Sequence, residues 1–133
     1  MSSPTSERLE QVWRDILTLH AHTVSAIDRE LDAHGLGASD FEVLNILAAL
    51  LPEESDRCRV QDLAGRVHLS QSGLSRLIGR LSETGLVERA SHQQDRRGVW
   101  ISLTRKGREL RNELLPVHRA VLARMLAGCG ETC

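Results

Sequence analysis

The residues best suited to chemistry lie in a short polar stretch, HQQDRRG, between two apolar runs. The stretch carries an aspartate followed by two adjacent arginines, Asp95, Arg96 and Arg97. The flanking runs, LVERAS and VWISL, contain β-branched residues and alternate in polarity, which is typical of β-strands. The polar stretch is therefore predicted to be the loop of a β-hairpin.

An arginine at the tip of such a hairpin is suited to DNA. A narrow minor groove concentrates negative potential and attracts an inserted arginine. Asp95 lies two residues before Arg97, where a charge-assisted pair would orient the guanidinium and leave Arg96 to contact phosphate. In isolation, the three residues would be interpreted as a solvated charge cluster.

A second polar face is predicted on a helix that begins after Ser70. Leucine and isoleucine recur at helical spacing through QSGLSRLIGRLSETG and are predicted to face inward. The opposite face offers small polar and basic residues near the start of the helix, which readout of a major groove requires. The candidate DNA-binding residues of this segment are Ser70, Gln71, Ser72, Ser75, Arg76 and Arg80. The alternative interpretation is a solvent-exposed face without a partner.

The neighbouring elements would position both features. VQDLAGRV is predicted to form a short helix and HLS a tight turn, so that Ser70 caps the next helix and Gly85 ends it. Two helices joined by a short turn form a helix-turn-helix, and the hairpin that follows makes it a winged helix. The preceding PEESDRC is predicted to be a polar loop.

Helices are predicted on both sides of this unit. A long amphipathic helix covers about residues 7–34, and a second helix begins with Ser39 or Asp40 as its N-cap. A final helix covers about residues 104–127, with a kink or division expected at Pro116. The predicted fold is mainly α with a small β-hairpin wing: a single domain over residues 1–133, with a winged helix-turn-helix over about 39–103. The apolar terminal helices have little to pack against within one chain, which favours a homodimer.

The charge distribution agrees with a nucleic-acid partner. The chain has 133 residues and a net charge of −1, but residues 70–111 hold nine basic and four acidic residues, a net of +5. A local basic excess is typical of a DNA-binding surface, although a solvated basic face would show it too. No apolar run approaches the roughly 20 residues of a membrane helix. The N-terminus lacks a secretory profile, so a cytoplasmic location is expected.

The stretch DLAGRVHLSQSGLSRLIGRLSETGLVER, followed by DRRGVWISLTRKG, resembles the multiple antibiotic resistance regulator (MarR) family of bacterial winged-helix transcription factors. The D-x-R motif at Asp95 and Arg97 and the L-T-x-x-G motif at residues 103–107 carry the likeness. The resemblance implies a homodimer with recognition helices over residues 70–80 and wings in flanking minor grooves. It also implies that Arg97 enters the minor groove and that Asp95 positions it. Relatives usually continue through a further helix, so a smaller dimer interface is expected here.

The sequence therefore predicts a sequence-specific regulator of transcription that binds double-stranded DNA at an inverted repeat. It is expected to be a repressor released by a small aromatic or anionic effector, with Trp13, His20 and His34 as candidate pocket residues by family position. The alternative is a winged-helix module for protein association that does not bind DNA specifically. Competition by duplex DNA for the protein partner would discriminate the two.

Enzymatic and metal chemistry find little support. The sequence has no paired carboxylates, Ser/His/Asp order or phosphate-binding loop, so neither an enzyme nor a cofactor is expected. His20 and His22, two residues apart on a helix, would point about 200° apart, which makes them poor partners for a metal. The three cysteines, Cys58, Cys129 and Cys133, lack metal-type spacing.

Overall fold

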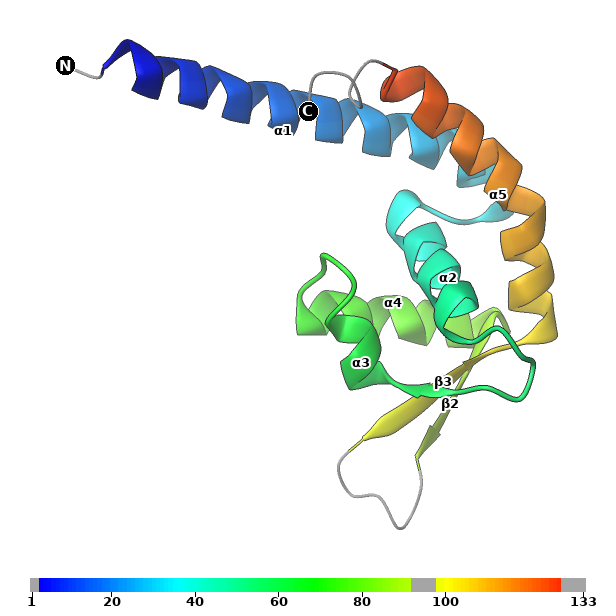
Figure 1. Cartoon of the computed structure of the whole chain (residues 1–133). Coiled ribbons are helices and arrows are strands. Elements are labelled where there is room, and N and C mark those ends of the chain that lie inside the picture. Colours follow the sequence, from blue (N-terminus) through cyan, green and yellow to red (C-terminus); the bar gives the residue numbers. More distant parts are fainter. Residues whose placement is uncertain (1–2, 92–97, 128–133) are drawn as a thin grey trace. The chain divides into compact units, whose positions relative to one another are not determined.

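The chain folds into two compact units. The computed structural model describes residues 3–91 and 98–127. Residues 1–38 and 116–133 form one unit, here called the terminal unit, and residues 39–115 form the other, the winged-helix unit. Figure 1 shows the elements along the chain.

The terminal unit contains the long helix α1 (Pro4–Leu31). The helix begins where Ser3 caps it, with the Ser3 hydroxyl accepting a hydrogen bond of 3.2 Å from the Ser6 N–H. A proline at the first helical position supports this start, because its missing N–H would have had no helical partner. A short 3₁₀ helix, η1 (Asp32–His34), follows and ends at Gly35 with a φ of 72°. The predicted long helix is confirmed, and it begins three residues earlier than expected.

The apolar stripe of α1 is buried along only part of its length. Thr23, Ala26, Ile27 and Leu31 are buried. Toward the N-terminus the stripe is open to solvent, with exposed fractions between 47% and 64%, at Leu9, Val12, Trp13, Ile16 and Leu17.

Helix α2 (Ala38–Leu50) begins before the predicted caps. Neither Ser39 nor Asp40 is the N-cap, because both lie inside the first turn. The Ala38 N–H instead donates to the carboxylate of Asp28, at 2.7 Å. The cap prediction was wrong because the acceptor comes from a residue ten positions earlier, which no local pattern reveals.

Three antiparallel strands form the sheet of the winged-helix unit: β1 (Cys58–Arg59), β2 (Val87–Ser91) and β3 (Val99–Leu103), in the order β1-β3-β2. The predicted hairpin is confirmed. The prediction of a polar loop at PEESDRC was wrong at its end, since Cys58 lies opposite Ile101 in the sheet. A strand of two residues is too short to show a period in the sequence.

The two helices of the motif are α3 (Val60–Ala64) and α4 (Gln71–Glu83). Helix α3 is shorter than predicted, while α4 matches the prediction. Ser70 caps α4 by accepting a hydrogen bond of 3.0 Å from the Gly73 N–H, and Gly85, with a φ of 78°, follows its end. The predicted inward residues of α4 are no more than 3% exposed: Leu74, Leu77, Ile78 and Leu81.

Helix α5 (Arg105–Met125) runs through Pro116, so of the two predicted outcomes, a kink or a division, the division is wrong. Its start is tied to the end of α4. The Thr104 hydroxyl donates to the Gly85 carbonyl at 2.6 Å and accepts from the Gly107 N–H at 3.0 Å. No helix in the described part of the chain is long and apolar enough to cross a membrane.

Candidate nucleic-acid interface

The outward face of α4 is open along its first two turns. Gln71, Ser72, Ser75 and Arg76 are all exposed, opposite the leucines that hold the helix in the core. Side chains of this kind can donate to and accept from the edges of base pairs. A Cβ added at Gly79 would meet nothing within 4 Å, so packing does not require the glycine there. The geometry agrees with a helix whose polar face meets a partner.

Ser70 and Arg80, two other predicted contacts, have partners inside the protein. The Ser70 hydroxyl is the N-cap of α4 and lies 3.4 Å from that of Ser72. The Arg80 guanidinium donates to the Asp40 carboxylate at 3.0 Å. The side chain of Asp40 is 12% exposed and that of Arg80 is 62% exposed. This ion pair joins α4 to α2, so the guanidinium of Arg80 already has a partner inside the protein.

The predicted wing residues, Asp95, Arg96 and Arg97, lie outside the described residues. The strands that carry them are described. Ser91 pairs with Val99 at the end of the β2-β3 ladder that leads into the loop. The two strands are therefore side by side where the loop begins and where it ends.

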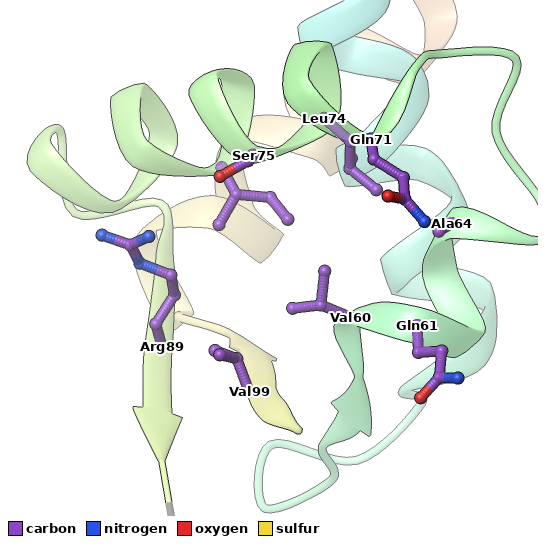
Figure 2. Close-up of a pocket in the computed structure, with 9 residues that line it drawn as sticks. Val60, Gln61, Ala64, Gln71, Leu74, Ser75, Arg89 and Val99 are labelled. Carbon is purple, nitrogen blue, oxygen red and sulfur yellow. The ribbon is translucent and has the colours of Figure 1, made fainter. Parts of the chain in front are cut away.

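A cavity of about 450 Å³ lies between the helices α3 and α4 and the strands β2 and β3. Figure 2 shows apolar side chains projecting into it, with Gln71 and Ser75 above and Arg89 rising from β2. Two of these polar residues also belong to the open face of α4. The lining residues are Val60, Gln61, Ala64, Gln71, Leu74, Ser75, Ile78, Arg89 and Val99.

The predicted effector residues do not line this cavity. Trp13, His20 and His34 belong to the terminal unit and all three are exposed. Within residues 3–91 and 98–127, no cluster of three or more His, Cys, Asp or Glu side chains could hold a metal ion.

Cys58, on β1, is half-buried. Burial raises the pKa of its thiol, the nearby Asp62 carboxylate raises it further, and Arg66 lowers it. The thiol is therefore less reactive than a free cysteine near neutral pH, because the thiolate is the nucleophile.

An aromatic and basic cluster was missed by the sequence analysis. The guanidinium carbons of Arg57 and Arg59 each lie 5.1 Å from the centre of the Trp100 ring. The missed strand β1 explains the omission, because only its pairing with β3 brings these residues together.

Comparisons with known proteins agree with the geometry. A model of the MarR family matches residues 34–98. The Bacillus subtilis protein YkoM, an uncharacterized HTH-type transcriptional regulator, is 28% identical over 100 residues, which cover 75% of this chain and 62% of YkoM. AbsC, a MarR family transcriptional regulator from Streptomyces coelicolor, is 31% identical with a TM-score of 0.76, over 94% of this chain and 80% of AbsC. Sco3205, a MarR family regulator from the same organism solved in complex with DNA, is 26% identical with a TM-score of 0.78, over 94% of this chain and 76% of Sco3205.

Proposed function

This chain belongs to the MarR family of transcriptional regulators, a family of regulators rather than enzymes, and we propose that it binds double-stranded DNA in a sequence-specific way. The observation that carries the proposal is the open polar face of α4, with Gln71, Ser72, Ser75 and Arg76 exposed above a buried apolar face. The similar protein Sco3205 was crystallised with DNA, which supports it. In this proposal Ser70 positions α4, while Arg97 enters a minor groove and Asp95 orients it.

The proposed active form is a homodimer. The exposed stripe of α1, at spacings of three and four residues, is an apolar face that a second copy would cover. A twofold dimer places two α4 helices in successive major grooves, which requires an inverted repeat with half-sites about 34 to 36 Å apart. A regulator of this kind acts on chromosomal DNA, which in bacteria means the cytoplasm.

We further propose that the protein is a repressor released by a small effector, and that the effector binds in the cavity beneath α4. Gln71 and Ser75 line the cavity and also lie on the face proposed to meet DNA, so an occupant would act on the contact residues directly. The cavity is largely apolar with Arg89 at its side, which favours a small molecule that has an apolar body and an anionic group. Loss of operator binding when aromatic carboxylates are added, abolished by Arg89→Gln, would support this site over one near Trp13, His20 and His34.

Selection from a random duplex library at near-physiological salt tests the proposed function. The full chain is expected to recover an inverted repeat with half-sites one helical turn apart. Recovery of weak binders without a consensus would contradict sequence-specific binding. It would favour a winged-helix module that associates with an acidic protein, and duplex DNA would then fail to compete with that protein.

A further inference from the structure

The cluster around Trp100 lies on the outer face of the wing sheet. Arg59 pairs directly with Trp100 across the β1-β3 ladder, so their side chains share a face. Along β3, Ile101 and Leu103 are buried on one side, whereas Trp100 and Ser102 are half-buried on the other. The cluster is therefore on the side of the sheet opposite the core.

The same cluster lies near the loop end of the β2-β3 hairpin. Trp100 comes two residues after Gly98, which is the last residue of the predicted wing loop and lies within the described residues. A Cβ added at Gly98 would lie 3.9 Å from the Cδ of Arg59, so the stem of Arg59 runs beside the end of that loop. A wing that reaches DNA brings this surface close to the backbone that flanks the groove.

Two positively charged groups lie beside the same ring. Both guanidinium carbons are 5.1 Å from the same ring centre, inside the range of about 6 Å for cation–π attraction, so they are no more than about twice that distance apart. An anion that contacts both guanidiniums would be attracted by two positive charges on one surface. A surface that gathers two arginines on one aromatic ring is thus suited to an anionic partner.

The chemistry of arginine points to phosphate. A guanidinium carries five N–H donors in a planar fork, so it can contact a ring and donate to phosphate oxygens at the same time. The ring also restricts the rotamers of both arginines before any ligand binds, which lowers the entropy lost on binding.

We propose that Arg57 and Arg59, held against Trp100, bind DNA backbone phosphates and extend the interface from the wing onto the outer face of its sheet. The inference rests on the proposed function and adds to it a contact that no motif of the sequence marks. These contacts carry no base preference, since a phosphate is the same in every sequence. They should strengthen binding to selected and unselected DNA alike.

The salt dependence of binding tests the proposal. Affinity for the selected operator duplex would be measured across a salt series for the full chain and for Arg57→Gln, Arg59→Gln and the double variant. Each lost phosphate contact is expected to reduce the slope of log K against log salt by about 0.9. The ratio of the binding constant of the wild type to that of each single variant should therefore fall about 3.5-fold between about 50 and about 200 mM salt. Arg14→Gln, an exposed arginine in the terminal unit, is the charge-matched control and should leave the slope unchanged.

The variants separate a phosphate contact from a structural role. Trp100→Leu, with Trp100→Phe as a milder second change, keeps both charges and is expected to weaken binding while retaining most of the slope. If the arginine variants bind more weakly with an unchanged slope, the cluster acts only by holding β1 to the wing and the proposal is wrong. It is equally wrong if the slope and affinity of both variants match the wild type. A wild type that binds no duplex at any salt would instead overturn the proposed function itself.

Discussion

Gly107 shows how one residue fixes the joint between the wing and α5. A Cβ at this position would overlap the backbone carbonyl of Leu86, which cannot move aside, and would press on the side chain of Leu103. The same joint contains the Thr104 hydroxyl, which accepts a hydrogen bond from the Gly107 N–H and donates one to the Gly85 carbonyl. The Thr and Gly of the L-T-x-x-G motif are thus explained by packing and capping rather than by contact with a ligand.

We predict that Gly107→Ala destabilises the protein by about 3 kcal/mol, because the methyl group forces backbone apart in a packed joint. Urea unfolding monitored by circular dichroism would measure the loss. The matched control is Gly79→Ala on α4, where an added Cβ meets nothing within 4 Å. Replacing a helical glycine that has no such crowding with alanine should increase the stability of the protein by about 0.5–1 kcal/mol. Equal effects of the two substitutions would contradict the packing explanation.

The two exposed arginines of α4 are expected to differ in what they do. Arg76 is exposed on the open face, whereas the guanidinium of Arg80 already pairs with Asp40. We predict that Arg76→Gln weakens binding to the selected operator by about 1–3 kcal/mol and relaxes the preference at one base pair. Arg80→Gln should cost less affinity and leave the preferred site unchanged.

Competition between operator variants, measured for both proteins, tests this difference. The reverse result, with altered preference only in Arg80→Gln, would mean that Asp40 releases Arg80 to read bases. A double-mutant cycle between Asp40 and Arg80 should give a coupling of about 1 kcal/mol or less, because the arginine is largely exposed.

At the scale of elements, the sequence predicted the helices and strands that have a strong hydrophobic period or a local capping residue. The buried stripe of α4, its cap at Ser70 and the cap of α5 at Thr104 all follow from residues a few positions apart. The hairpin followed from alternation on both sides of a polar loop. These features depend on neighbours in sequence, so one sequence is enough to find them.

The elements that were missed depend on distant residues. Strand β1 exists because Cys58 and Arg59 pair with β3 about forty residues later, and two residues carry no pattern of their own. The candidate site shows the same division. The face of α4 was predicted, but the ring contacts of Arg57 and Arg59 required the register of β1 against β3. The Asp40–Arg80 pair likewise joins residues forty positions apart.

The start of α2 provides a test at this scale. The Ala38 N–H donates a hydrogen bond to the Asp28 carboxylate. Asp28 therefore does what the side chain of a local N-cap residue would otherwise do. We predict that Asp28→Ala destabilises the protein by about 0.5–2 kcal/mol, the usual cost of losing an N-cap. Thermal unfolding would measure it, with Glu30→Ala, an exposed acidic residue on the same helix, as the control. A loss no larger than that of Glu30→Ala would show that α2 does not depend on this bond.

For the molecule as a whole, the exposed stripe of α1 is the basis of the proposed dimer. Trp13 is 59% exposed and Ile16 is 53% exposed, within a row of five large apolar residues on one helix face. Monomeric proteins rarely leave a contiguous apolar patch of this kind uncovered, since water contact with it is unfavourable. A second copy that covers the stripe would also supply the second α4 that an inverted repeat requires.

We predict that Trp13→Glu combined with Ile16→Glu converts a dimer into a monomer, because the two charges would be buried without partners in the interface. Sedimentation velocity would measure the change in mass, and circular dichroism would confirm that the helices remain. Arg8→Glu, an exposed polar position on the same helix, is the control and should stay dimeric. A monomer reaches one half-site, so its salt slope on the full operator should fall to about half that of the dimer. Full operator affinity in a monomeric variant would show that α1 does not couple two DNA-binding units, and the twofold model of recognition would then be wrong.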